Sequence, residues 1–231
     1  MARLRILVDN RAVTPGVRPE WGLSILLERD DGGLVLWDAG LSGETLCYNA
    51  SVLGLLDELR SLEAVFISHL HRDHYGGLSC VAHYAPGTPV YMPPGPGHVA
   101  AWARRLGLAP IVVEKPLRAA GVAATRALPS GIGLMERALA YRSRGGLIVL
   151  LGCSHPGADR LLDEALRETG EEKAVLLVGG VHGAPPSVVD HLAGKAERMA
   201  LIHCSGSAAE YAKRRYPRKT LESGAGSVLL A

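Results

Sequence analysis

One short segment constrains what this chain can fold into more than any other. An apolar stretch over residues 64–68 runs directly into the sequence HLHRDH, so four side chains that commonly bind metals follow within six residues. Alternate side chains of an extended segment point the same way, so His69 and His71 can hold one ion. Asp73 and His74, past the turn, can then hold a second ion beside it. The segment therefore predicts a two-metal site at the end of a strand.

The distribution of apolar residues predicts a mixture of strands and helices. Short apolar runs bounded by Gly, Pro or Asp are typical of strands, and Leu and Ala spaced three and four apart are typical of helices. Strands are predicted over 4–8, 23–28, 34–38, 64–68, 90–92, 110–113, 122–126, 136–142, 146–151, 174–178, 199–203 and 227–230. Helices are predicted over 51–60, 97–107, 157–169, 187–198 and 207–216. This order favours sheets covered by helices, and because no repeat or linker divides the chain, we expect a single domain over 1–231.

Three further histidines, His155, His182 and His203, each follow a predicted strand. Loops at strand ends carry much of the chemistry of proteins, so we expect these side chains to gather at one cleft. His182 could donate a proton, contact the substrate or bind a metal. Ser154 and Ser205 are placed to cap the helices predicted after them.

The composition narrows the classes of function. A net charge of +2 is too small to favour nucleic-acid binding, and the basic run over 213–219 is typical of a solvated helix face. No apolar run is long enough for a spanning helix or a signal sequence, so we expect a cytoplasmic protein without a membrane partner. The four cysteines are widely spaced without a CxxC pair, which predicts free thiols. The chain has no Gln and only two Asn, which favours a hot source.

The metal-binding segment and the Gly-Gly-Leu that follows it resemble the signature of the metallo-β-lactamase superfamily. This resemblance implies an α/β fold, the four-layer αββα sandwich of two mixed sheets flanked by helices. The earlier segment over 34–40 resembles the superfamily's strand that ends in Asp-x-Gly. It implies that Asp38 holds a metal-ligating histidine in place, with a helix or turn cap as the alternative role.

The segments around His155, His182 and His203 are similar to one branch of that superfamily, and the similarity covers most of the chain. The branch is that of the 7,8-dihydropterin-6-methyl-4-(β-D-ribofuranosyl)-aminobenzene-5′-phosphate synthases. The resemblance implies one set of protein ligands for each ion: His69, His71 and His155 for the first, and Asp73, His74 and His203 for the second.

The chain also departs from these patterns. Many members of the superfamily bridge the two ions with an Asp, whereas the comparable strand here ends at Gly152 and Cys153. Cys153 can bridge the ions as a thiolate or merely line the site. Cys204 is predicted to line the site without binding metal. The branch tends to show Glu-Gln where this chain has Glu136 and Arg137.

These features predict a metal-dependent hydrolase that acts on a small anionic ester, with a phosphoester as the favoured substrate. Two divalent ions would lower the pKa of a shared water, with zinc as the default and manganese, iron or nickel as alternatives. Asp73 and His182 are the predicted catalytic residues, and backbone N–H groups near Gly206 could receive a phosphate. The branch implies a transferase that releases diphosphate as the alternative. A non-hydrolytic metal or redox module is a third interpretation.

Overall fold

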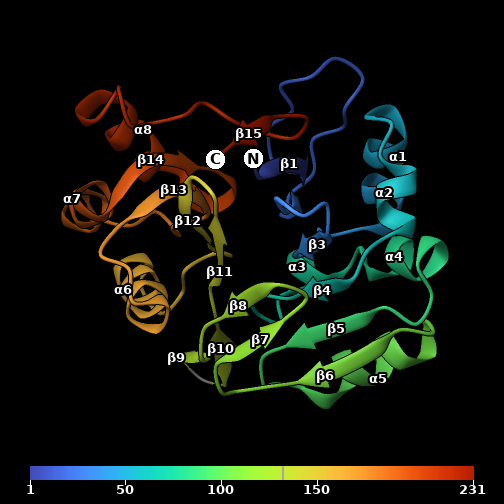
Figure 1. The fold of residues 1–231 in the computed structure, drawn as a ribbon. Helices are drawn as coiled ribbons and strands as arrows, with labels where there is room; N and C mark the ends of the chain where they lie inside the picture. Colours follow the sequence, from blue (N-terminus) through green and yellow to red (C-terminus); the bar gives the residue numbers. More distant parts are fainter. Residues whose placement is uncertain (132) are drawn as a thin grey trace.

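The computed structural model describes residues 1–131 and 133–231, which form two large mixed β-sheets packed face to face (Figure 1). The first sheet has the spatial order β15 (Val228–Leu230), β1 (Arg3–Val8), β2 (Ser24–Glu28), β3 (Leu34–Trp37), β4 (Ala64–Phe66), β5 (Pro89–Met92) and β6 (Ala109–Val112). The second has the order β14 (Ala196–Leu201), β13 (Ala174–Gly179), β12 (Gly146–Leu150), β11 (Leu139–Ser143), β8 (Val122–Ala124) and β7 (Leu117–Ala119). Strands β9 (Leu128–Ser130) and β10 (Leu134–Glu136) form a separate antiparallel pair.

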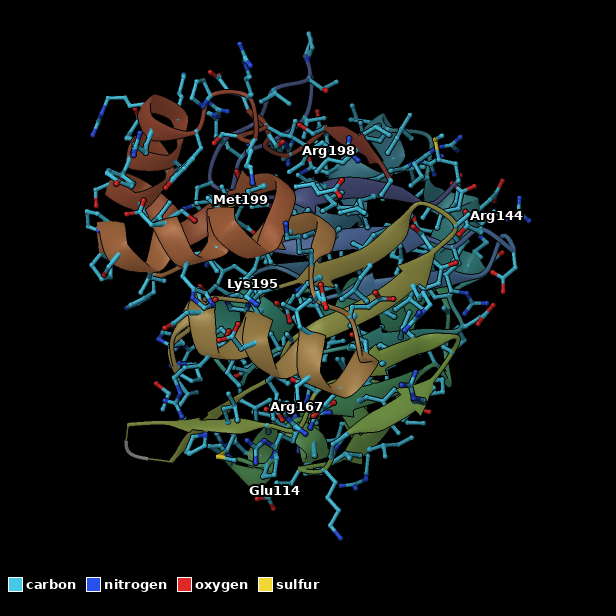
Figure 2. All side chains as sticks on the ribbon, turned by 60° about the vertical axis from the view of Figure 1, so that its left-hand side comes forward. Glu114, Arg144, Arg167, Lys195, Arg198 and Met199 are labelled. Carbon is cyan, nitrogen blue, oxygen red and sulfur yellow. A yellow bond between two sulfur atoms is a disulfide. The ribbon has the colours of Figure 1, made fainter. Side chains whose placement is uncertain are left out.

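Helices cover the outer face of each sheet. The first sheet packs against α1 (Gly43–Val52), α2 (Leu56–Arg60), α4 (Leu78–Tyr84) and α5 (Gly97–Arg105). The second packs against α6 (Ala158–Thr169), α7 (Pro186–Lys195) and α8 (Gly206–Arg215). Figure 2 shows this second helical layer from outside, with charged side chains such as Arg167 and Lys195 along its exposed face.

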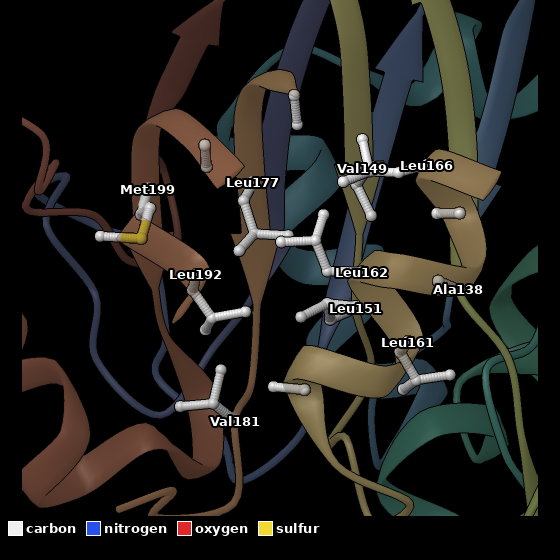
Figure 3. Close-up of a cluster of buried hydrophobic side chains, with 14 of the residues drawn as sticks. Ala138, Val149, Leu151, Leu161, Leu162, Leu166, Leu177, Val181, Leu192 and Met199 are labelled. Atoms are coloured by element: carbon white, nitrogen blue, oxygen red, sulfur yellow. The ribbon is translucent and has the colours of Figure 1, made fainter. Parts of the chain in front are cut away.

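Three hydrophobic clusters hold the four layers together, because successive side chains of a strand point to opposite faces of its sheet. In β13, Leu176 and Val178 lie between the two sheets, whereas Leu177 lies under the helices (Figure 3). In β1, Ile6 faces the second sheet and Leu7 faces α1. The layers confirm the predicted αββα sandwich.

Several element boundaries differ from the prediction. In place of one helix over 51–60, the chain forms α1 and α2, which are separated at Gly54 in a left-handed conformation (φ 69°). Helix α1 begins at Ser42, whose hydroxyl accepts a hydrogen bond from the Thr45 N–H. The predicted strand over 136–142 is broken because the Arg137 N–H donates to the Ser68 carbonyl and not to a neighbouring strand of its sheet. The helix predicted over 187–198 ends at Lys195, and β14 follows without a loop.

The prediction of four free thiols is wrong for two of them. Cys47 and Cys80 form a disulfide that links α1 to α4 across 33 residues of sequence. Both residues lie on helices far apart in the chain, so their spacing gave no indication that they are neighbours. Cys153 and Cys204 are free, as predicted.

Among the described residues, no helix is both long enough and apolar enough to cross a membrane.

Candidate metal centre

The candidate site lies where strands of both sheets end. Asp38 follows β3, His69 follows β4, and His155, His182 and His203 follow β12, β13 and β14. Strands β3 and β4 are parallel, as are β12, β13 and β14, so each set of loops emerges at one edge of its sheet. Contacts between side chains of the two sets, described below, show that the two edges meet.

The backbone at this edge adopts conformations that L-amino acids rarely take. Among the described non-glycine residues, five have a positive φ, and four of them are in the site: Asp38 (54°), Ser154 (66°), His182 (46°) and His203 (56°). Each such residue costs about 1–3 kcal/mol and persists only where its surroundings enforce it. Such conformations concentrate at functional sites, so this clustering supports a functional role for the edge.

Three of the predicted ligands form a group that we call the carboxylate cluster: Asp73, His74 and His203. The Asp73 Oδ2 atom lies 3.6 Å from Nε2 of His74 and 3.5 Å from Nε2 of His203. The Cys153 Sγ atom lies 3.2 Å from the same His74 nitrogen. One ligand atom from each of these four residues lies within 4.8 Å of the others, a separation that one ion could span.

The other three predicted ligands form the histidine cluster: His69, His71 and His155. Nε2 of His69 lies 3.1 Å from Nδ1 of His71, and the three ring centroids are 4.7–4.8 Å apart. Ligand atoms of His69, Cys153 and His155 also lie within 4.8 Å of one another. The Cys153 thiol therefore reaches both clusters.

Hydrogen bonds fix the rings of the carboxylate cluster from behind. Asp38, which is fully buried, places Oδ2 at 2.7 Å from Nδ1 of His74 and accepts the Ser68 N–H with Oδ1. Nδ1 of His203 donates to the Asn10 side-chain oxygen, and Asp9 accepts the His203 backbone N–H. Both rings therefore turn Nε2 toward Asp73, which is how a ligating histidine is commonly oriented.

Two buried ring nitrogens point to a group that the protein does not supply. Among the residues described, Nε2 of His155 and Nε2 of His203 have no hydrogen-bond partner. A buried polar atom without a partner is costly, and neutral imidazole nitrogens are good ligands for divalent metals. The donor set of imidazoles, a carboxylate and a thiol therefore fits transition-metal ions.

A buried carboxylate that the sequence analysis gave no role organises the loop with Cys153 and His155. Glu136 accepts the backbone N–H groups of Cys153, Ser154 and His155 at 2.7–2.8 Å. The predicted cap by Ser154 is wrong, because its hydroxyl donates to the Gly180 carbonyl and α6 begins after Gly157. Nor does Ser205 cap α8, since its hydroxyl donates to the Ile202 carbonyl. The signals of Glu136 in the sequence were its place next to an apolar run and its match to the Glu of the Glu-Gln pair in the related branch.

Burial sets the protonation of the histidine cluster. It holds the pKa of His69 well below the usual histidine value and lowers the pKa of His155 to about 4. Burial also lowers the pKa of His71, although less. All three rings are therefore neutral at pH 7, the form that binds metals.

The carboxylate cluster has the opposite electrostatics. Burial lowers the pKa of His74, but the adjacent Asp38 carboxylate outweighs burial and the net shift is upward. Burial raises the pKa of Asp73, but the adjacent His203 ring and the charge of His74 outweigh it, so this carboxyl is ionised. Glu136 belongs to neither cluster. Burial raises its pKa to about 7, despite the three N–H hydrogen bonds that its carboxylate accepts.

A third group of ligand atoms contains Cys153, His182 and Cys204, again within 4.8 Å of one another. The His182 N–H donates to Cys204 Sγ at 3.3 Å, and the His182 ring is exposed, 4.5 Å from that of His155. A hydrogen bond with the Cys153 thiol lowers the pKa of Cys204 to about 5 and raises the pKa of Cys153. A Cβ at Gly180 would lie 2.7 Å from Cys204 Sγ, so only glycine leaves room for this thiol.

The structure thus brings together every residue that the sequence analysis placed in the site. Those residues are Asp38, His69, His71, Asp73, His74, Cys153, His155, His182, His203 and Cys204. Their roles as ligands or catalysts remain predictions. Glu136 and Asn10 were assigned no role, because their partners lie 17 to 193 residues away in the chain.

The fold and this site define a class of protein. The family model of the metallo-beta-lactamase superfamily matches residues 18–193. The chain therefore belongs to that superfamily.

Particular relatives are more distant. A protein of Methanocaldococcus jannaschii, 7,8-dihydropterin-6-methyl-4-(beta-D-ribofuranosyl)-aminobenzene-5'-phosphate synthase, is 24% identical to this chain, with 71% of this chain and 72% of the relative covered. The crystal structure of a metal-dependent hydrolase of the beta-lactamase superfamily has a TM-score of 0.79 at 24% identity and covers 100% of this chain and 99% of its own. A diphosphatase of the PhnP family has a TM-score of 0.68 at 16% identity, over 99% and 96%. The two structural likenesses show the fold.

Proposed function

We propose that the protein is a metal-dependent hydrolase with a dinuclear centre. The observation that carries this proposal is the pair of ligand clusters joined by the Cys153 thiol, with unpartnered ring nitrogens in both. Two divalent ions, when bound, lower the pKa of a water molecule and stabilise negative charge on substrate oxygens. The histidine cluster would hold one ion and the carboxylate cluster the other.

Two side chains would act on protons in this reaction. Asp73 is ionised and lies between two ring nitrogens, so it can accept a hydrogen bond from the attacking water and fix its direction. The exposed ring of His182 lies beside the histidine cluster, where it can donate a proton to the leaving group. His182 keeps a strained left-handed backbone conformation. Such conformations concentrate at functional sites, which supports a functional role for this residue.

Zinc is the metal that the donors favour. Imidazole, carboxylate and thiol ligands together suit zinc, and the thiol makes manganese less suitable than it would be in an all-carboxylate site. Iron and nickel remain the alternatives.

We infer a small anionic substrate, with a phosphate-containing ester favoured. The M. jannaschii relative is named for a 5'-phosphate product, and one structural neighbour is called a diphosphatase. Gly206 begins α8 beside His203, so its first backbone N–H groups can receive an anionic group next to the carboxylate cluster.

A synthase is the second candidate, and the M. jannaschii relative favours it. In that case the ions would stabilise a departing diphosphate. Diphosphate release that requires both a pterin diphosphate and an aminobenzene ribotide would support the synthase, whereas turnover of a single phosphoester with water would support the hydrolase.

We further propose a single-domain cytoplasmic protein from a hot source. Disulfides are rare in cytosolic proteins, but intracellular proteins of hyperthermophiles are an exception, so the Cys47–Cys80 bond is compatible with that setting. The absence of Gln agrees with it. The net charge of +2 does not favour a nucleic-acid partner.

Metal content tests the proposal directly. Elemental analysis of protein supplied with zinc should give close to two ions per chain for the wild type, and the His71→Ala variant should lose the ion of the histidine cluster. Because the Cys153 thiol reaches both clusters, Cys153→Ala should retain at most one ion. His191→Ala is the matched control, since His191 pairs with Asp163 away from the site. A wild type without bound metal would refute the dinuclear centre.

A further inference from the structure

Trp21 is the most exposed of the chain's three tryptophans. Trp37 is fully buried and Trp102 is half-buried, whereas 57% of the Trp21 surface is exposed. An indole ring is one of the largest apolar surfaces that a side chain can present, and leaving it in water forgoes the free energy of burying it. The position of this ring therefore requires an explanation.

The backbone on both sides of Trp21 is firmly anchored. The Glu20 carboxylate accepts hydrogen bonds from the Ser42 N–H and from the hydroxyls of Ser42 and Thr45 at 2.6–3.1 Å. The Gly22 N–H donates to the Asn10 side chain, and a Cβ at Gly22 would lie 2.7 Å from the Asp73 carbonyl oxygen. The exposed ring thus sits between two fixed residues.

The ring lies against the candidate metal centre. Its centroid is 5.1 Å from the ring of His203, at an interplanar angle of 53°. Asn10 ties Trp21 to the same histidine, because its side chain accepts from the Gly22 N–H and contacts Nδ1 of His203. The loop that carries Trp21 is therefore part of the construction of the carboxylate cluster.

We propose that Trp21 binds a planar aromatic or heteroaromatic ring of the substrate and so selects aryl over alkyl esters. This inference rests on the proposed function and adds the substrate class. Because the residues on both sides of Trp21 are anchored, its backbone loses little conformational entropy on binding, so stacking against the ring contributes directly to affinity. Stacking of one ring on an aromatic side chain should give a preference of about tenfold, which corresponds to about 1.4 kcal/mol. The reacting phosphate would then lie at the carboxylate cluster, beside His203.

A comparison of two esters with the zinc-loaded protein tests this selection. Phenyl phosphate and ethyl phosphate share the phosphate but differ in their leaving groups, so the change in the ratio of their kcat/KM values from wild type to variant, and not the ratio itself, reports the contribution of Trp21. Trp21→Ala should lower this ratio about tenfold, mainly through the KM of phenyl phosphate, and Trp21→Phe should retain most of it. Trp102→Phe, a tryptophan of α5, is the control and should leave the ratio unchanged. A ratio that is the same in wild type and Trp21→Ala would overturn the proposal.

A binding measurement separates this inference from the proposed hydrolysis. Phenylphosphonate and ethylphosphonate cannot be hydrolysed at an ester bond, so calorimetry gives their dissociation constants even if no ester turns over. Wild type should bind phenylphosphonate about tenfold more tightly than ethylphosphonate, and Trp21→Ala should lose this difference. Equal binding of both would refute the aromatic subsite. A dimer that dissociates only in Trp21→Ala, detected by sedimentation, would also refute it, because the ring would then be covered by a second copy of the chain.

Discussion

The two ligand clusters of the site are built in different ways. In the carboxylate cluster, His74 and His203 are buried, and each ring is held from behind by Asp38 or Asn10. In the histidine cluster, His71 is exposed, and its Nδ1 faces the ring of His69 and not a carboxylate. One cluster is thus charged and braced, and the other is neutral and more open.

This difference indicates how the two ions should behave. A braced ligand needs no reorganisation to bind, and an ionised carboxylate attracts a cation, so the carboxylate cluster should bind its ion more tightly. The open cluster should bind its ion less tightly and exchange it faster. The first two predictions that follow test this asymmetry, and the third tests the support of the histidine cluster in the metal-free protein.

Removal of one ligand from each cluster should have unequal consequences. His74→Ala removes a ligand and leaves Asp38 buried without its partner, so we expect metal affinity at the carboxylate cluster to fall at least about a hundredfold, with a loss of stability. His71→Ala removes an exposed ring and should weaken only the histidine cluster, without that loss of stability. Titration with zinc against a chelator, together with thermal unfolding, measures both. Equal losses in the two variants would contradict the asymmetry.

The hydrogen bond between Asp38 and the His74 ring can be weakened without removing any predicted ligand. Asp38→Asn is nearly isosteric, and asparagine tolerates the left-handed backbone at this position. The neutral amide no longer orients and polarises the His74 ring as a carboxylate does. Zinc affinity of the carboxylate cluster should therefore fall about 10- to 100-fold, with the histidine cluster unaffected. If both clusters weaken to the same degree, Asp38 supports the whole site rather than one ion.

Glu136 braces the loop of the histidine cluster and should make the stability of the metal-free protein depend on pH. Its pKa is raised from 4.5 to about 7 on folding, so between these values the folded state binds more protons than the unfolded state. The contribution of Glu136 to the free energy of unfolding should consequently fall as pH rises from 4.5 to 7, by about 3 kcal/mol at 1.36 kcal/mol per pH unit, and it opposes the rise with pH that the lowered pKa values of His69 and His155 contribute.

Denaturation at pH 5 and at pH 7 measures this slope. Glu136→Gln has no such titration and should lack this part of the slope, whereas the exposed control Glu114→Gln should keep it. The same slope in Glu136→Gln as in the wild type would show that other groups cause it.

The contrast between the clusters also explains what the sequence could predict. The predicted ligands His69, His71, Asp73 and His74 lie within six residues of the chain, so local spacing was enough to group them. The strand ends that carry His155 and His203 were recognisable, but their assignment to an ion came from a resemblance to a family.

The groups that support the ligands could not be predicted in the same way. Asn10 meets His203 across 193 residues, and Glu136 meets Cys153 across 17, and neither contact leaves a periodic pattern in the chain. The Cys47–Cys80 disulfide depends on how α1 packs against α4, and α1 itself was misplaced because Thr, Cys and Asn are weak helix formers. Sheets covered by helices were predictable because the strands are short, continuous apolar runs, whereas the four-layer arrangement was implied by the resemblance to the superfamily, and contacts between distant loops leave no such pattern.

The left-handed backbone at Asp38, Ser154, His182 and His203 has a consequence for protein engineering. Glycine relieves such strain at little steric cost, so a library selected for heat resistance alone would tend to enrich glycine at these positions. Each such replacement would also delete a side chain of the site or its support. Selection for heat resistance should therefore favour glycine at these four positions, whereas selection for turnover should favour the present residues. Variants that gain melting temperature at these positions should be the ones that lose their metal.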